Sequence, residues 1–235
     1  MPSPTSPTER DDRTVAAFDF DGTLIRGDSL LPFLGLVVGR VRVGRALAAR
    51  AHRIVGALAG LNDRDLVKAD VLGSLLAGVD AGLLSELGRA YAQRLLGRLR
   101  PDVWARVAWH RERGHELVIV SASLAVYLDP LGSACGFDQV LATELEIGDD
   151  GRATGRLLGV NVRGPEKLAR LSRWLGGAPS MLYAYGDSAG DRFLLAAATE
   201  ALMVRRRGLV GWTETRSRRG KGRTKLPAGW PTGAG

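Results

Sequence analysis

The sequence predicts an α/β fold with a mostly parallel sheet, interrupted by an all-helical insertion. Short apolar runs, of the length of buried parallel strands, alternate with helical patterns over residues 101–204. Between the first apolar run, at 15–18, and the next, residues 28–100 carry apolar side chains at spacings of three and four and contain no strand candidate. We therefore expect residues 15–27 and 101–204 to form a core domain and residues 28–100 a helical cap.

The core should contain five strands, in a mostly parallel sheet, and one hairpin. The strands are expected at residues 15–18, 116–120, 139–142, 181–184 and 201–204. A glycine–aspartate turn at 148–151 separates the two arms of the hairpin, 144–147 and 153–158. Helices are expected at residues 101–113, 124–135, 165–175 and 190–198. Gly114 should cap the first of these helices, and Pro130 should break or kink the second.

In the cap we expect three helices, at residues 30–58, 63–77 and 81–99. Asn62 and Asp80 are the candidate N-caps of the second and third, because each precedes a run with helical spacing.

Charge is distributed unevenly along the 235 residues. The net charge is +8, yet residues 205–235 hold nine Lys or Arg and one acid, so residues 1–204 are formally neutral. These last residues lack apolar periodicity, which predicts a basic, disordered tail. The tail could make weak contact with an anionic membrane or with nucleic acid. Nothing in the sequence indicates an obligate protein partner.

Composition favours a soluble, cytoplasmic protein, with 45% hydrophobic and 25% charged residues. The single cysteine, Cys135, excludes an intramolecular disulfide. Residues 1–14 lack the apolar segment of a secretory signal and predict a disordered lead.

Polar side chains follow several of the expected strands. Asp19 and Asp21 follow the first strand and Ser121 the second. Asp187 follows the fourth, with Asp191 four residues further on, and Lys167 opens a helix between the second and fourth strands. Because ligands bind at the carboxyl ends of parallel strands, we expect these groups to converge. Clustered carboxylates repel each other unless a cation lies among them, and Mg²⁺ takes such oxygen ligands together with phosphate. The pattern predicts a phosphoryl-transfer site.

The motifs DFDGTL, VIVSAS, NVRGPEK and GDSAGD occur in this order, each at a strand end or a helix start. The ordered set resembles the haloacid dehalogenase superfamily, and the position of the helical insertion resembles its phosphoserine phosphatase-like subfamily IB. The resemblance spans about residues 15–204 and implies a Rossmann-like core with a helical cap that closes over the site and selects the substrate.

The resemblance also implies roles for individual residues. Asp19 would attack phosphorus and form an aspartyl-phosphate, and Asp21 would act as acid and then as base. Asp19, Asp187 and the backbone carbonyl of Asp21 would bind Mg²⁺, with Asp191 orienting a metal-bound water or Lys167. Phosphoryl oxygens would contact the backbone N–H groups of Gly22 and Thr23 and the side chains of Ser121 and Lys167.

Asp28 has two interpretations. The resemblance places it where phosphoserine phosphatases use an acid to recognise the substrate amine, but it could equally cap the first cap helix. No arginine matches the family's residue for the substrate carboxylate; the nearest basic residues are Arg64 and Lys68.

We therefore expect a Mg²⁺-dependent phosphomonoesterase acting on a small phosphorylated metabolite. The first alternative is a phosphatase of lysophosphatidate or phosphatidylglycerophosphate at a membrane surface, which the arginine-rich first cap helix would favour. The second, less favoured, is a non-catalytic protein that binds through its basic tail.

Overall fold

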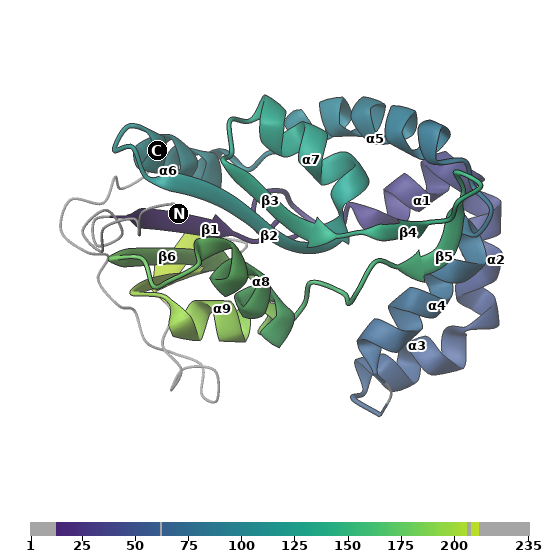
Figure 1. Ribbon diagram of the computed structural model, residues 1–235. Helices are drawn as coiled ribbons and strands as arrows, with labels where there is room; N and C mark the ends of the chain where they lie inside the picture. The colour runs from purple at the N-terminus through teal and green to yellow at the C-terminus, as the bar shows by residue number, and fades with distance from the viewer. Residues whose placement is uncertain (1–12, 62, 206–207, 212–235) are drawn as a thin grey trace, which may run out of the picture.

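The computed structural model describes residues 13–61, 63–205 and 208–211. Its centre is a six-stranded sheet in the order β3-β2-β1-β6-β7-β8 (Figure 1). The strands are β1 Thr14–Phe18, β2 Glu116–Leu124, β3 Gln139–Thr143, β6 Met181–Gly186, β7 Glu200–Arg205 and β8 Gly208–Gly211. All pair in parallel except β8, which is antiparallel to β7. The predicted α/β fold with a mostly parallel sheet is confirmed.

Helices cover both faces of this sheet. One face carries α6 (Pro101–Arg111) and α7 (Ala125–Ala134), and the other carries α8 (Pro165–Leu175) and α9 (Arg192–Ala197) (Figure 1). Successive β1 side chains point to opposite faces, so Ala16 and Phe18 join the cluster beneath α6 and α7, while Val15 and Ala17 join the one beneath α8 and α9. Both faces are covered, which explains why the parallel strands are continuously apolar.

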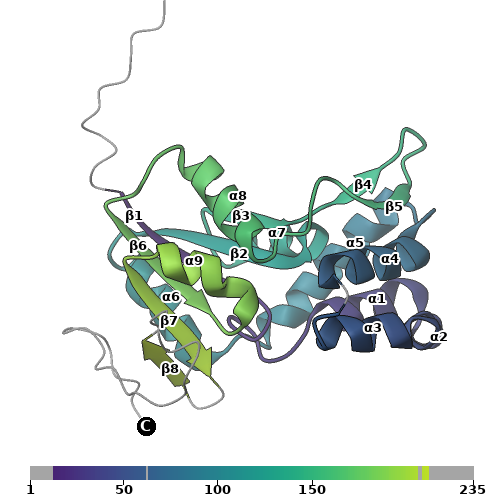
Figure 2. The same cartoon turned by 90° about the horizontal axis from the view of Figure 1, so that it is seen from below.

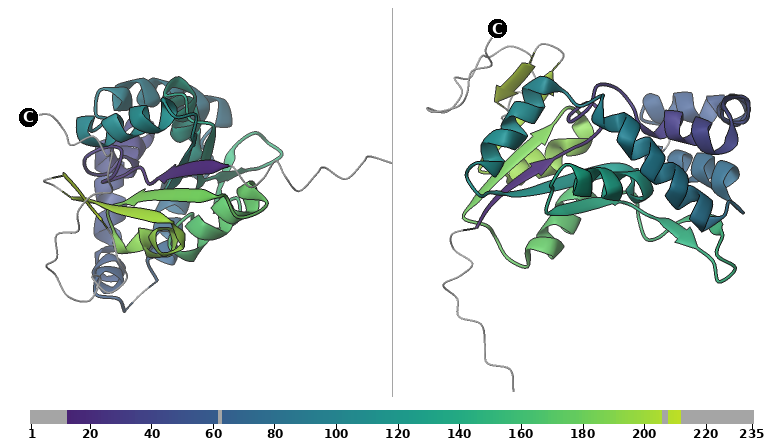
Figure 3. Two further views of the ribbon diagram at one scale, coloured as in Figure 1. Left: turned by 90° about the vertical axis from the view of Figure 1, so that its left-hand side faces the viewer. Right: turned by 90° about the horizontal axis from the view of Figure 1, so that it is seen from above.

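The segment between β1 and α6 is built of helices. They are α1 (Leu30–Val38), α2 (Arg40–Ala49), α3 (Ala51–Leu58), α4 (Arg64–Leu76) and α5 (Ala81–Leu96). Their apolar side chains, such as Phe33 and Leu72, belong to the same cluster as Phe18, so the cap and one face of the sheet share a core. Viewed from above, α5 and α7 lie side by side across the junction (Figure 3).

The predicted hairpin, β4 (Leu145–Ile147) and β5 (Ala153–Leu157), packs on the cap. The Gly78 N–H donates to the Ala153 carbonyl, and the Ala153 N–H donates to the Val79 carbonyl, both at 2.8 Å. A Cβ on Gly73 would lie 2.9 Å from the Gly155 carbonyl oxygen, so only glycine allows α4 to approach β5 this closely.

The helix predicted at residues 30–58 is wrong as a single element, because it is broken twice. Gly39 adopts a φ of 84° between α1 and α2, and Arg50 leaves helical geometry between α2 and α3. One-residue breaks scarcely change the apolar periodicity, so the spacing could not reveal them. The last cap helix ends at Leu96 rather than at residue 99.

Of the two predicted N-caps, Asp80 is confirmed, since its carboxylate accepts the Leu83 N–H at 3.0 Å. Asn62 lies outside the described residues. The N-cap of α4 is Asp63, which accepts the N–H groups of Asp65 and Leu66.

Three further predictions need correction. Strand β2 continues past residue 120 to Leu124, with a shift in its register against β3. Pro130 lies inside α7 and does not break it. Residues 208–211, which we expected in a disordered tail, form β8, because the edge of β7 offers backbone partners there. The predictions for residues 1–12 and 212–235 fall outside the described residues. Within the described part of the chain, no helix is long and apolar enough to cross a bilayer.

His110 should make stability depend on pH. It is fully buried, with Nε2 2.8 Å from Tyr185 Oη and Nδ1 2.8 Å from His115 Nδ1. Burial, assisted by the nearby His115, lowers the pKa of His110 to about 3. In the unfolded chain His110 binds a proton near pH 6.5, whereas in the folded chain it stays neutral. The contribution of His110 to the free energy of unfolding is therefore fully present above pH 6.5 and is lost as the pH falls toward 3.

Between pH 7.5 and pH 5, the free energy of unfolding should fall by about 2 kcal/mol because of His110. Urea unfolding at both pH values measures this difference. In His110→Gln, which cannot take up the proton, most of this loss should disappear; an undiminished loss in that variant would contradict the assignment.

Candidate active site

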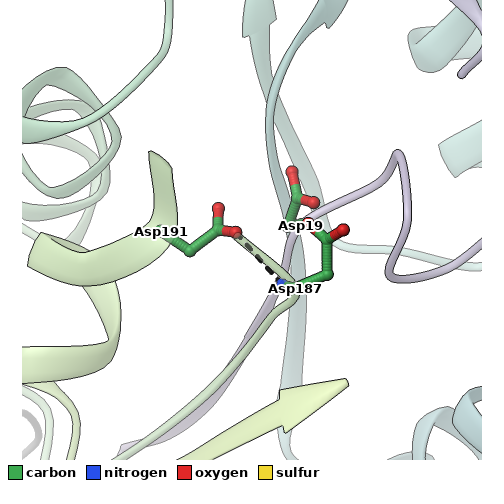
Figure 4. Close-up of side chains that lie close together, drawn as sticks. All are labelled: Asp19, Asp187 and Asp191. Carbon is green, nitrogen blue, oxygen red and sulfur yellow. Dashed lines mark hydrogen bonds between the residues drawn. The ribbon is translucent and has the colours of Figure 1, made fainter. Parts of the chain in front are cut away.

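Three carboxylates meet at the carboxyl edge of the sheet (Figure 4). Asp19 directly follows β1, Asp187 directly follows β6, and Asp191 lies in the short 3-10 helix Ala189–Asp191. One carboxylate oxygen from each lies within 4.8 Å of the others. Asp19 and Asp191 are buried, at 6% and 1% exposure, while Asp187 is partly open. The predicted convergence of Asp19, Asp187 and Asp191 is therefore found.

Lys167 projects from the first turn of α8 into this cluster. Its Nζ donates to Asp19 Oδ1 at 2.5 Å and to Asp191 Oδ1 at 2.6 Å. Burial opposes a charge on Lys167, but the two carboxylates outweigh it and raise its pKa. The lysine therefore stays protonated and neutralises one of the three negative charges.

The remaining charge is unfavourable without a cation. Burial raises the pKa of Asp19 and Asp191 raises it further, against the opposing effect of Lys167. Burial and then Asp191 also raise the pKa of Asp187. A hard divalent cation is the partner that such a buried group of oxygens fits, and it would restore the ionised form of both.

Asp191 accepts more hydrogen bonds than either of the other two carboxylates. Its Oδ2 accepts the N–H of Asp187 at 3.1 Å and both the N–H and the hydroxyl of Ser188 at 3.0 Å, while Oδ1 is taken by Lys167. A Cβ on Gly186 would lie 2.5 Å from the Asp191 Cβ, so this packing requires glycine. Asp191 therefore holds the loop and the lysine, and Asp19 and Asp187 are better placed to offer oxygens to a metal.

Gly22 is required by a close contact with Asp187. Its φ is 79°, and a Cβ there would lie 2.0 Å from Asp187 Oδ2. We expected the N–H groups of Gly22 and Thr23 to face phosphoryl oxygens. In the structure they close their own loop instead, donating to the carbonyls of Gly27 at 3.1 Å and Phe20 at 3.2 Å. The Thr23 hydroxyl donates to Asp19 Oδ2 at 3.1 Å and so orients that carboxylate.

Ser121 lies where β2 loses its register with β3, between Val120 and Leu124. Its side chain is 2% exposed, and its hydroxyl accepts the Ser123 N–H at 3.1 Å. The irregular stretch is the one that carries the predicted second motif.

Asp21 belongs to a buried hydroxyl network that the sequence did not reveal. Its Oδ2 accepts from Ser123 Oγ at 2.5 Å and from Ser29 Oγ at 3.1 Å, and Ser29 Oγ is 3.0 Å from Tyr127 Oη. Burial raises the pKa of Asp21 to about 6 despite these hydrogen bonds, which lower it. Its Oδ1 is buried without a hydrogen-bond partner among the described residues. A buried carboxyl oxygen without a partner is uncommon in a folded protein.

Lys68 and Asn161 are also missing from the predicted site. The ammonium of Lys68 in α4 donates to the Ala122 carbonyl and, at 2.7 Å, to Asn161 Oδ1. Burial lowers the pKa of Lys68 to about 8. Asn161 Nδ2 donates to Asp65 at 2.7 Å, which completes a link between cap and core. From the sequence, Asp65 and Lys68 resemble an ordinary solvated helix pair, so no local signal identifies them.

Asp28 precedes Ser29, the N-cap residue of α1, and its Oδ2 accepts the Leu31 N–H of the first turn at 2.8 Å. It also lines a cavity of about 620 Å³ together with Asp21, Gly22 and Asp187. Arg26, Arg100 and Arg205 lie on the same cavity wall. The capping interpretation is thus observed, and the position remains open to a substrate.

A family model of the haloacid dehalogenase-like hydrolases matches residues 16–196, which include every motif residue described above. The chain belongs to this family. The prediction that it is a hydrolase of this superfamily is therefore confirmed, and the carboxylate cluster lies within the matched residues.

Several curated relatives match most of this hydrolase. Protein CicA of Caulobacter vibrioides is 35% identical over 79% of this chain and 83% of its own length. A phosphoserine phosphatase of Halobacterium salinarum is 32% identical, covering 81% and 85%, and a histidinol-phosphatase of Neisseria meningitidis is 28% identical, covering 82% and 90%. A solved structure of a Bordetella pertussis protein of unknown function has a TM-score of 0.64 at 25% identity, covering 81% and 89%.

Proposed function

We propose that this protein is a phosphomonoesterase that hydrolyses a small phosphorylated metabolite through an aspartyl-phosphate at Asp19. The observation that carries the proposal is the buried Asp19, paired with Lys167 at 2.5 Å and placed beside the partly open Asp187. A buried carboxylate held by a cation, at the sheet edge where ligands bind, is equipped to attack an electrophile. Two of the relatives named above are phosphatases, which supports phosphorus as that electrophile.

In the first step, the Asp19 carboxylate attacks phosphorus, and the bond between phosphorus and the leaving alcohol oxygen breaks. Asp21, in its protonated form, gives its proton to that oxygen. A pKa near 6 lets Asp21 be protonated in a useful fraction of molecules at the start of the cycle. Lys167 stabilises the negative charge that accumulates on the phosphoryl group.

In the second step, Asp21 is ionised and removes a proton from water. The water oxygen attacks phosphorus, the bond to Asp19 breaks, and the Asp19 carboxylate and inorganic phosphate are released. One residue serves both steps because its proton state alternates between them. Ser29 and Ser123 hold Oδ2 of Asp21, so Oδ1 remains the oxygen for both transfers.

Asp19 and Asp187, with the Asp21 carbonyl, would hold Mg²⁺, and Asp191 would fix the loop that presents Asp187. When bound, the ion would supply positive charge to the phosphoryl oxygens and to Asp19. The raised pKa values of Asp19 and Asp187 support a cation at this position.

The cavity supports a small polar substrate. Its wall consists mainly of acidic, basic and glycine residues and holds one large apolar side chain, Val204. The alcohol of the substrate would extend toward Asp28 and Arg26. Side chains that could pack along an acyl chain are scarce in this wall, so the cavity does not favour the lipid-phosphate alternative.

The test is hydrolysis of para-nitrophenyl phosphate by the purified full chain, with Mg²⁺ and with EDTA. We expect turnover that EDTA reduces at least roughly a hundred-fold and that added Mg²⁺ restores. A panel containing phosphoserine and histidinol phosphate then identifies the alcohol. A folded protein that hydrolyses none of these esters at any Mg²⁺ concentration would refute the proposal.

Removing the hydroxyl that holds Asp21 should slow the reaction. Ser123→Ala should lower kcat by roughly 10- to 100-fold, because a hydrogen bond to a charged group contributes about 1.5–3 kcal/mol. Ser85→Ala is the matched control, since that hydroxyl accepts only from Arg89 on the cap surface. Equal kcat values in the two variants would exclude a role for Ser123 in placing Asp21.

A further inference from the structure

The first three cap helices form an outer layer of the molecule. Seen from below, α1, α2 and α3 lie on the far side of α4 from the β4–β5 hairpin (Figure 2). Residues 29–61, which contain this layer, include five arginines and no aspartate or glutamate. We call residues 29–61 the outer cap layer.

Large apolar side chains are exposed on and beside this layer. Of the eleven such side chains among the described residues, six lie between residues 31 and 66: Leu31, Val41, Val55, Leu58, Leu61 and Leu66. In α3, the exposed positions 51, 55 and 58 share one helical face and are Ala, Val and Leu. Solvent-facing stripes of globular helices are normally polar, so this face is unusual for a surface in contact only with water.

An apolar groove of about 670 Å³ continues the same surface between α1, α2 and α5. Leu31, Leu36, Val43 and Leu47 line it. Among the described residues, Arg40 and Arg94 are the charged members of its wall, and none of its lining residues carries a carboxylate. Its chemistry suits an amphiphile with a negative head and an apolar tail.

The arginines of this layer are divided between two tasks. Arg50 and Arg53 pair with Asp70 of α4, at 2.8 and 2.6 Å, and fasten the layer to the cap. Arg40, Arg42 and Arg45 are exposed and take part in none of the ion pairs of the described residues. These three cations are free to meet an external anion.

We propose that the outer cap layer docks on an anionic lipid bilayer. Exposed leucine and valine beside unpaired arginine is the composition of a helix that lies in the bilayer interface, where the apolar face enters the acyl boundary and the cations meet the headgroups. A second copy of this chain suits the surface less well, because symmetric pairing would place the arginines of one copy against the arginines of the other. The docking does not require a lipid substrate, because the active-site cavity is separate from the groove.

The experiment is co-sedimentation of the full chain with vesicles of phosphatidylcholine alone, and with vesicles containing phosphatidylglycerol. The cap variant carries Arg40→Gln, Arg42→Gln and Arg45→Gln. The tail control carries Arg216→Gln, Arg218→Gln and Arg219→Gln, which removes the same charge. Val55→Ser with Leu58→Ser removes the apolar stripe, and Leu158→Ser with Val160→Ser is its control, since those side chains are similarly exposed. Unchanged thermal melting establishes that each variant is folded.

We expect binding only to the anionic vesicles. Each arginine near the surface contributes about five-fold, so the cap variant should bind roughly a hundred-fold more weakly, while the tail control changes less. The Val55/Leu58 variant should bind roughly ten-fold more weakly than the Leu158/Val160 control. Absence of binding, equal binding to neutral vesicles, or an equal loss in the tail control would overturn the proposal. So would sedimentation of the free protein as a dimer that Val55→Ser with Leu58→Ser dissociates.

Discussion

Asp19→Asn should lower kcat for para-nitrophenyl phosphate at least roughly a thousand-fold, because an amide cannot displace the alcohol from phosphorus. The substitution preserves the size of the side chain, and its oxygen can still accept from Thr23 or Lys167. The fold should survive, since the cluster carries one negative charge fewer. Steady-state hydrolysis, with circular dichroism as the check on folding, measures the effect.

A matched substitution distinguishes the loss of the nucleophile from the loss of one negative charge. Glu146→Gln also removes one carboxylate charge, but on the β4–β5 hairpin, where Glu146 pairs with Arg156. Its kcat should equal that of the wild type. If Asp19→Asn retained a tenth or more of wild-type kcat, the carboxylate of Asp19 could not be the attacking group.

Gly22→Ala should abolish activity almost as completely. A Cβ at this position would lie 2.0 Å from Asp187 Oδ2 and 2.5 Å from Asp187 Cγ, so either the loop or the Asp187 carboxylate must move. These movements would displace the Asp187 carboxylate, which would hold the metal, and the backbone that connects Asp21 to β1. We expect kcat/KM to fall at least roughly a hundred-fold, since small displacements at a reacting centre have effects of this size.

Gly60→Ala is the control for backbone strain. Gly60 has the same φ of 79°, but a Cβ there would meet no atom within 4 Å. Both variants should lose about 1–2 kcal/mol of stability from the left-handed conformation. Only Gly22→Ala should lose activity and require more Mg²⁺ for half-maximal rate. Equal effects of the two substitutions on kcat/KM would mean that the contact with Asp187 is unimportant.

The sequence predicted those parts of the site that lie at a strand end or at a helix start. Asp19 and Asp187 converge because parallel strands present their carboxyl ends at one edge, which apolar periodicity reveals, and Lys167 joins them from the first turn of α8. Ser29, Tyr127 and Lys68 could not be found in this way. Ser29 contacts Asp21, Tyr127 contacts Ser29, and Lys68 contacts Ala122, and these positions depend on how the helices that carry or follow them pack.

The errors in the fold have local causes. Gly39 breaks a helix through a backbone angle that leaves the apolar spacing unchanged. Residues 208–211 form β8 because they pair with the edge of β7. That edge exists only in the tertiary structure, so the local sequence does not predict the strand. Pro130 stays in α7 because the α7 segment packs against α5 and β3, and this packing outweighs the local preference against proline.

The most direct test of the central claim is to trap the covalent intermediate. The full chain is mixed with a rapidly hydrolysed substrate and Mg²⁺, quenched in acid, and reduced with borohydride, which converts an aspartyl-phosphate to homoserine. Peptide mass spectrometry then locates the modified residue. The account predicts homoserine at position 19 of the wild type and none in Asp19→Asn. Homoserine at another aspartate, or unmodified Asp19 at a time when released alcohol exceeds released phosphate, would contradict it.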